Sequence, residues 1–231
     1  MEFFDLSIPN VGTSAIEAQV HKVGIAFFKN APVNTDELLR FATHFGAVLK
    51  DGAGKEDGVS RIAYDPIRAQ QIGGKAYSRQ PLFPHTDRSA YAEPPRFVIT
   101  VAVHIRGVGG SSTFVSGDVL FKRFAEQDPK GLESLMDRNN FVFRRSDTLL
   151  PAPIFEASDR VPFRIRFRWD EALYISPAAI PHASTFVQAS RDAAWDVVLE
   201  ERQGYILDNH RMLHGRRGFY GEREIWRVLV T

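Results

Sequence analysis

The chain of 231 residues contains no cysteine. This absence excludes disulfide bonds and thiolate metal ligands, so a transition metal would have to be held by His, Asp or Glu. The sequence also lacks a run of about 18 apolar residues, which predicts that no segment spans a membrane. Its first residues lack the basic region and apolar run of a signal peptide, and we therefore expect a cytoplasmic protein.

The chain also lacks an excess of one charge, because its 29 Lys and Arg residues are balanced by 28 Asp and Glu residues. This balance argues against a dedicated binder of nucleic acid or of a membrane surface. Hydrophobic residues make up 44% and charged residues 25% of the chain, which is typical of a globular protein. Repeats, low-complexity segments and linkers are absent as well, so we expect a single domain over residues 1–231. The oligomeric state cannot be read from the sequence.

Most of the predicted elements are short strands separated by turns, with helices before residue 50 and in two later inserts. This pattern favours a mainly β fold with flanking helices (α+β) around a double-stranded β-helix, or jelly-roll, core. One helix is expected over Asp36–Phe45, with Thr35 as its N-cap. The polar residues 51–58 are expected to form a surface turn, and residues 66–80 an irregular segment that is either a lid or a plain loop.

Residues 161–169 alternate between large apolar and arginine side chains. The alternation predicts a strand with one buried face, formed by Phe163, Ile165, Phe167 and Trp169. The opposite face carries Arg164, Arg166 and Arg168, which we interpret as a solvated row. Another strand, Phe97–Ile105, contains His104 among apolar residues. We interpret His104 as a core histidine whose hydrogen bonds are satisfied.

His85 and Asp87 are separated by one residue in a segment that Pro84 biases toward an extended backbone. In an extended chain, side chains at i and i+2 leave the same face, so both can reach one ion. Far along the sequence, His214 supplies a second histidine. Two histidines and one carboxylate are the facial triad of non-haem Fe(II) oxygenases. The alternative is that these are structural histidines and a turn aspartate.

Four segments, in the same order along the chain, are similar to Fe(II)- and 2-oxoglutarate-dependent oxygenases of the taurine dioxygenase/clavaminate synthase-like superfamily. Residues 84–87 match the proximal His-Thr-Asp/Glu motif. Residues 109–117 resemble the stretch Gly-Gly-Glu/Asp-Thr-Leu-Phe-Val-Asp-Gly, and residues 208–216 resemble Asp-Asn-x-Arg-x-x-His-Gly-Arg. Residues 223–227 resemble the arginine-containing strand that follows. This similarity extends over more than half of the chain.

The resemblance implies that His85, Asp87 and His214 bind Fe(II). It implies that Arg223 binds the distal carboxylate of the co-substrate 2-oxoglutarate, aided by Ser112. The family has Thr at the position of Ser112, and Ser keeps the hydroxyl donor. The second co-substrate would be O2, and turnover would release succinate and CO2. The cofactors implied are therefore Fe(II), 2-oxoglutarate and O2.

Arg227 follows Arg223 by four residues, so in a strand the two side chains share a face. A second buried guanidinium needs its own anion, which is an internal Asp or Glu, the co-substrate or an acidic group of the substrate. The resemblance favours the last two, because the matching arginine of taurine dioxygenase contacts the anionic group of its substrate. We therefore expect an anionic small-molecule substrate, such as an amino acid or a derivative. Ser111 and Ser116 replace acidic residues of the family and leave the substrate's identity open.

Hydroxylation is the leading reaction, although desaturation, epimerisation and ring closure would use the same residues. Two other classes of protein are also compatible with a jelly roll. One is a metal cupin enzyme that does not use 2-oxoglutarate, against which Arg223 and Ser112 argue. The other is a non-catalytic jelly-roll binding module, against which the intact His-Asp-His triad argues.

Overall fold

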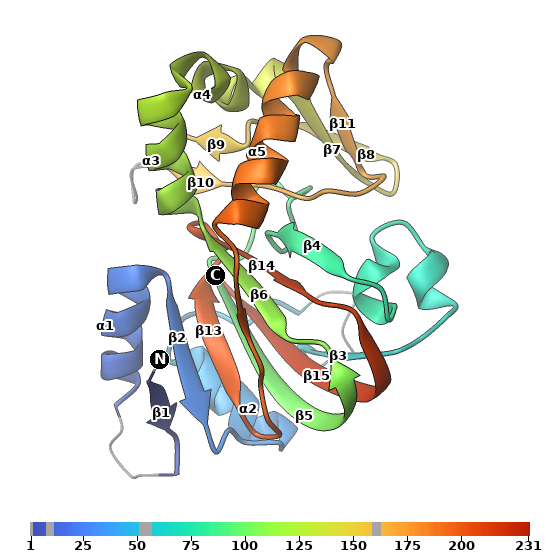
Figure 1. Cartoon of the computed structure of the whole chain (residues 1–231). Helices are drawn as coiled ribbons and strands as arrows, with labels where there is room; N and C mark the ends of the chain where they lie inside the picture. The colour runs from blue at the N-terminus through green and yellow to red at the C-terminus, as the bar shows by residue number, and fades with distance from the viewer. Residues whose placement is uncertain (1, 8–11, 51–56, 159–162) are drawn as a thin grey trace.

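The computed structural model describes residues 2–7, 12–50, 57–158 and 163–231 (Figure 1). Two of its sheets build the centre of the molecule. The larger sheet has the strand order β1 (Phe3–Asp5), β2 (Ile25–Lys29), β13 (Gly204–Asp208), β5 (Phe97–Gly109), β15 (Phe219–Val230) and β3 (Val59–Ala63). The smaller sheet has the order β12 (Trp195–Val197), β6 (Ser112–Ser116), β14 (Met212–Arg216) and β4 (Leu82–His85).

These two sheets share one apolar core. Phe114 and Met212 of the smaller sheet pack in the same cluster as Phe27, Ala102 and Leu229 of the larger sheet. Apart from the parallel β1–β2 pair, all strand pairs in both sheets are antiparallel. Two facing antiparallel sheets joined by this topology form a double-stranded β-helix. The predicted jelly-roll core is therefore confirmed.

Two helices cover the other face of the larger sheet. They are α1 (Thr13–Val23) and α2 (Thr35–Thr43), whose apolar residues pack with Phe28 and Ile99 of the sheet. The N-cap of α2 is Asn34, whose side-chain oxygen accepts hydrogen bonds from the backbone N–H groups of Asp36 and Glu37. The prediction of Thr35 as N-cap is wrong by one residue, because Asn34 is also a strong capping residue and stands first.

A second layer of elements packs at one end of the barrel (Figure 1, top). It contains α3 (Gly117–Gln127), α4 (Pro129–Met136), α5 (Ile180–Asp192) and the strands β7 (Phe141–Arg145), β8 (Thr148–Pro151), β9 (Phe155–Glu156), β10 (Arg164–Ile165) and β11 (Leu173–Ile175). Its core is rich in phenylalanine, and Phe155, Phe163 and Phe186 are in contact there. Phe167, which belongs to the same core, exchanges hydrogen bonds with Thr86, the residue between His85 and Asp87.

The arginine row is not solvated, so that interpretation is wrong. Arg166 is only 2% exposed, and its guanidinium donates to the backbone carbonyls of Ser89, Tyr91 and Ala92. Arg164 is largely buried and forms a salt bridge with Glu156 at 2.6 Å. Phe163, Ile165 and Phe167 are buried as predicted, but Trp169 is exposed, and the segment after Asp87 covers the opposite face. The strand is limited to Arg164–Ile165, and residues 161–162 lie outside the described residues.

Residues 66–80 contain two short 3-10 helices, η1 (Arg68–Gln70) and η2 (Gly74–Tyr77). Most of the expected turn at 51–58 lies outside the described residues. His104 is not a core residue, because its side chain is 37% exposed between Glu201 and Glu222. It follows the buried part of β5, where the strand runs past the core.

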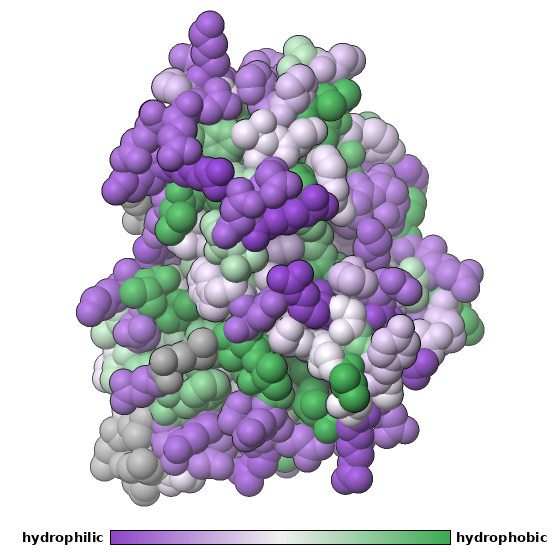
Figure 2. All heavy atoms as spheres, in the orientation of Figure 1, coloured by the Kyte–Doolittle hydropathy of each residue, from purple (hydrophilic) through white to green (hydrophobic). Residues whose placement is uncertain are grey.

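On the face shown in Figure 2, hydrophilic residues dominate and hydrophobic residues are exposed in scattered patches. Within the described part of the chain, every helix is too short or too polar to cross a membrane.

Candidate metal centre and co-substrate cavity

Strands β4 and β14 bring the two predicted histidine ligands together. In their antiparallel pairing, His214 lies directly opposite His85, and the ring centroids are 4.7 Å apart. Gly215 allows this close approach, because a Cβ atom there would lie 2.5 Å from the carbonyl oxygen of Leu82. The register shifts directly after His214, which is the signature of a β-bulge, a feature often found next to active sites.

Asp87 follows β4 and is fixed by its backbone. Its N–H donates to Asn209 Oδ1 at 2.8 Å, and the Asn209 side-chain amide donates back to the Asp87 carbonyl at 3.1 Å. The neighbouring Thr86 exchanges hydrogen bonds with the backbone of Phe167. Asn209, which directly follows β13, therefore positions the carboxylate beside the histidines.

The side chains of His85, Asp87 and His214 converge on one point. Each offers one possible ligand atom, and these atoms all lie within 4.8 Å of one another. His214 Nε2 is 3.6 Å from Asp87 Oδ2. His85 Nδ1 is 3.0 Å from the carbonyl oxygen of Phe83, so it carries the proton and donates. His85 Nε2 is then unprotonated, as a metal ligand must be.

The protonation of this cluster fits a divalent cation. Burial lowers the pKa of His214 to about 3, with a further contribution from nearby His85, and burial also lowers the pKa of His85. Both imidazoles are therefore neutral near pH 7. Burial opposes ionisation of Asp87, but the positive charge of Arg227 holds the pKa of this carboxyl below its usual value. Asp87 Oδ2 is buried without a hydrogen-bond partner, which a bound cation would supply.

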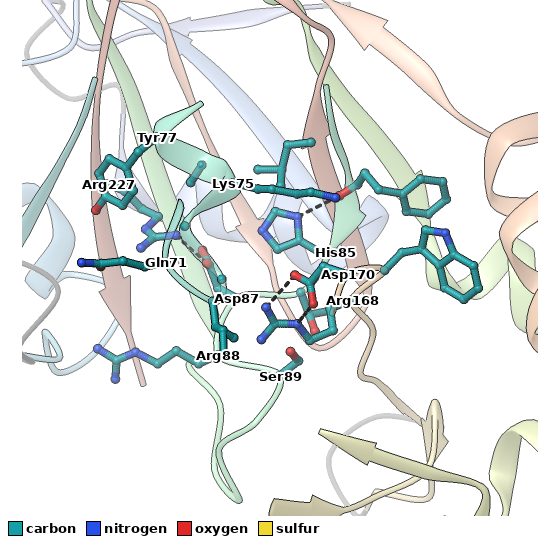
Figure 3. A pocket seen from close by; sticks show the side chains of 18 of the residues that line it. Gln71, Lys75, Tyr77, His85, Asp87, Arg88, Ser89, Arg168, Asp170 and Arg227 are labelled. Atoms are coloured by element: carbon teal, nitrogen blue, oxygen red, sulfur yellow. Dashed lines mark hydrogen bonds and ion pairs between the residues drawn. The ribbon is translucent and has the colours of Figure 1, made fainter. Parts of the chain in front are cut away.

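The other oxygen of Asp87 is held by Arg227, whose Nη1 lies 2.5 Å from Asp87 Oδ1 (Figure 3). Of the three anions considered for Arg227, the structure thus shows the internal carboxylate. Arg227 reaches Asp87 from β15, while its Nε atom is buried without a hydrogen-bond partner. One Asp87 oxygen is therefore fixed by a guanidinium, and the other faces His214.

Arg223 and Ser112 line one cavity next to His214, together with Arg216 and Tyr205. Burial lowers the pKa of Arg223 to about 10. Among the described residues, no hydrogen bond or ion pair joins Arg223 to a carboxylate. The turn formed by Gly109 and Gly110, which lies between β5 and β6, packs closely against Arg223. A Cβ atom at Gly110 would lie 3.3 Å from Arg223 Cδ. A buried guanidinium without a counterion is a suitable site for a carboxylate ligand.

A second cavity, of about 390 Å³, is lined by His85, Asp87 and Arg227 among others (Figure 3). Its walls include η1, η2, residues 85–89 and residues 168–170. Arg168 forms a two-pronged salt bridge with Asp170, with both N–O distances at 2.6 Å. The two cavities share four lining residues, Ala76, Leu82, His85 and Arg227. The candidate metal centre therefore lies where the cavities meet.

The structure places all six predicted site residues around this junction. Sequence reasoning missed Arg216, which lines the same cavity as Arg223, and the pair Arg168 and Asp170 in the larger cavity. A signal for Arg216 was present, because residues two apart in a strand share a face and Arg216 follows His214 by two. Arg168 had no comparable signal, since its alternation with Phe167 indicated only an exposed position.

Comparisons with known proteins agree with this geometry. The model of the family described as "Taurine catabolism dioxygenase TauD, TfdA family" matches residues 3–229. Among solved structures, an asparagine oxygenase in complex with Fe(II), 2S,3S-3-hydroxyasparagine and succinate superimposes with a TM-score of 0.76 at 14% identity, covering 94% of this chain and 77% of that one. The non-haem iron oxygenase OrfP in complex with Fe and alpha-ketoglutaric acid gives 0.72 at 15% identity, with 94% and 78% covered.

A third similar structure is PvcB, an Fe, alpha-ketoglutarate-dependent oxygenase from an isonitrile synthetic pathway. Its TM-score is 0.72 at 18% identity, with coverage of 100% of this chain and 83% of PvcB. At these identities the structural matches establish a shared fold, whereas the family match extends over nearly the whole sequence. The chain belongs to the TauD/TfdA family of dioxygenases.

Proposed function

We propose that the protein is an Fe(II)- and 2-oxoglutarate-dependent dioxygenase that hydroxylates a small molecule. The observation that carries this proposal is the adjacency of two incomplete sites. A His-Asp-His cluster leaves a carboxylate oxygen without a partner, and next to it Arg223 has no carboxylate partner among the described residues. A divalent cation and a dicarboxylate co-substrate would complete both. A metal cupin enzyme that does not use 2-oxoglutarate would not require the buried Arg223.

In this proposal His85, Asp87 and His214 hold Fe(II), which, when bound, couples the oxidative decarboxylation of 2-oxoglutarate by O2 to oxidation of the substrate. The protein contributes position and exclusion of water. Arg223 binds the distal carboxylate through two N–H groups, and Ser112 adds a hydroxyl donor. Arg227 orients Asp87 by holding its Oδ1 atom. Succinate and CO2 leave as by-products.

We further propose that the substrate is an amino acid or a derivative with an anionic group. The larger cavity has room for such a molecule, and Arg227 lines it with only one of its donors engaged by Asp87. The similar structures include an asparagine oxygenase with hydroxyasparagine and OrfP with (3S)-hydroxy-L-Arg. A carboxylate of the substrate would bind the remaining donors of Arg227.

Succinate formation tests the reaction class. The protein is incubated with Fe(II), ascorbate, O2 and 2-oxoglutarate, and a panel of amino acids and derivatives is screened for stimulation of succinate release. We expect succinate in the wild type and in Arg106→Gln, an exposed arginine on β5. We expect none in His214→Ala. Absence of 2-oxoglutarate-dependent succinate from the iron-loaded wild type would contradict the proposal.

The role of Arg227 is tested once a substrate is found. We expect Arg227→Gln to raise the KM for the substrate by about 10-fold or more, because a charge-assisted hydrogen bond is lost. The KM for 2-oxoglutarate should change much less. Equal effects on both KM values, or a preference for an uncharged substrate, would show that Arg227 only orients Asp87.

A further inference from the structure

Arg216 is a second guanidinium in the co-substrate cavity. It lies on β14 two residues after His214, so its side chain leaves the strand on the same face as the histidine. Only 5% of Arg216 is exposed, although arginine is rarely buried without a counterion. It lines the cavity that also contains Arg223 and Ser112.

The partners of Arg216 are backbone carbonyls and an aromatic ring. Its Nη2 donates to the carbonyl oxygen of Ser78 at 2.8 Å and its Nη1 to that of Arg217 at 3.4 Å. Its guanidinium carbon lies 4.7 Å from the centre of the Phe219 ring, and that of Arg223 lies 5.9 Å from the same ring. In the described part of the chain, neither guanidinium is paired with a carboxylate. The two arginines thus flank one ring and share one cavity.

Two like charges in one cavity cost free energy until an anion joins them. Arginine stays protonated at pH 7, so both buried guanidinium groups carry a positive charge. Hydrogen bonds to carbonyl dipoles compensate a full charge only in part. A single carboxylate between the two guanidinium groups would relieve the repulsion and accept hydrogen bonds from both.

Ser78 connects Arg216 to the larger cavity, which we propose binds the substrate. It directly follows η2, and its N–H is bonded to the carbonyl of Lys75. Lys75 and Tyr77 of this turn line the larger cavity. The turn is tightly packed, because a Cβ atom at Gly74 would lie 1.9 Å from the carbonyl oxygen of Arg68. A change in how firmly Arg216 holds Ser78 therefore acts on the whole turn.

We propose that Arg216 binds the distal carboxylate of the co-substrate together with Arg223, and that its bond to Ser78 makes the η2 turn more rigid when the co-substrate is bound. Because this role presupposes 2-oxoglutarate, it rests on the proposed function. Arg216 is then a binding residue for the co-substrate and a positioning residue for the wall of the substrate cavity.

The first experiment compares two oxo acids that differ only at the distal end. Binding of 2-oxoglutarate and of 2-oxopentanoate, which has a methyl group instead of the distal carboxylate, is measured by calorimetry with Mn(II) in place of Fe(II). We expect Arg216→Gln to reduce the preference for 2-oxoglutarate by about 10-fold or more, since one charge-assisted bond is lost. Arg216→Lys, which keeps the charge, should retain part of the preference.

Arg217→Gln is the matched control. Arg217 is exposed and pairs with Asp196 at 2.8 Å, an interaction worth little to stability, so the preference should be unchanged. Equal weakening of both oxo acids in Arg216→Gln would mean that Arg216 only shapes the cavity, and would overturn the proposal, as would an unchanged preference. If the wild type itself does not bind 2-oxoglutarate, the proposed function fails as well.

The second experiment measures amide hydrogen exchange of residues 74–78 with and without 2-oxoglutarate. In the Mn(II)-loaded wild type and in Arg217→Gln, we expect 2-oxoglutarate to slow the exchange of the Ser78 amide. In Arg216→Gln this slowing should disappear, even at concentrations that saturate the site. Slowing of the same size in Arg216→Gln and wild type would disprove the link between the two cavities.

Discussion

The two cavities that meet at His85 differ in how their charges are compensated. In the larger cavity, both lining carboxylates are paired with an arginine, Asp87 with Arg227 and Asp170 with Arg168. In the smaller cavity, Arg216 and Arg223 lie together without a carboxylate among the lining residues. The folded chain therefore pairs both carboxylates that line the larger cavity, whereas the lining of the smaller cavity offers Arg216 and Arg223 no carboxylate.

This difference indicates what each cavity is built for. A paired carboxylate is held in one orientation, which suits a metal ligand that must present one oxygen. An uncompensated pair of guanidinium groups lowers the stability of the ligand-free protein but provides binding energy for an anion. Removing a charge should therefore have opposite effects on stability in the two cavities.

The largest effect is expected for Asp87→Ala on the paired side. The substitution removes a metal ligand and leaves Arg227 largely buried without its anion, which costs about 3–5 kcal/mol when one partner of a buried pair is removed. We expect no turnover and a clear fall in the unfolding midpoint in urea, measured without metal. A metal-free Asp87→Ala protein as stable as the wild type would contradict the claim that the pair is complete in the folded chain.

A smaller loss is expected for Arg166→Met, which tests the support behind Asp87. The carbonyls of Ser89, Tyr91 and Ala92 would lose their donor, at a cost of roughly 2–4 kcal/mol for several buried acceptors. Because these residues follow Asp87, metal affinity should fall together with stability. Denaturant unfolding and a metal titration measure both, and Arg106→Gln is the exposed control. Loss of stability with unchanged metal affinity would limit Arg166 to a purely structural role.

The smallest change, and of opposite sign, is expected for Arg223→Met on the unpaired side. Burial lowers the pKa of Arg223 to about 10 from its usual 12.5, so its charged form is disfavoured in the folded state. Removing the charge should stabilise the metal-free, ligand-free protein by at most about 3 kcal/mol, the amount that this lowering of the pKa gives at 1.36 kcal/mol per pKa unit. The unfolding midpoint in urea measures this gain. A destabilised Arg223→Met would mean that the cavity already contains a counterion.

How far the sequence could predict this site depends on the range of the interactions. The spacing of His85 and Asp87, and the pairing of an early and a late strand in a jelly roll, follow from local patterns and the expected fold. The partner of Arg227 does not, because Asp87 lies 140 residues away in the chain and is placed by Asn209 after another strand.

The same limit explains the wrong interpretations. Alternation correctly predicted that Phe163, Ile165 and Phe167 are buried, but it could not indicate that a segment 77 residues away covers Arg166. For His104, the apolar residues of β5 suggested a core position. The strand extends beyond the core to Gly109, so the end that carries His104 lies at the surface.

The most direct test of the central claim is an anaerobic titration of the Fe(II)-loaded protein with 2-oxoglutarate, followed by the visible charge-transfer absorption that forms when a 2-oxo acid chelates Fe(II). We predict that this absorption develops in the wild type and does not form in His214→Ala. In Arg223→Met it should require on the order of 100-fold more 2-oxoglutarate, because a two-pronged, charge-assisted carboxylate contact is lost. A wild type without this absorption, or an Arg223→Met titration that coincides with that of the wild type, would contradict the account.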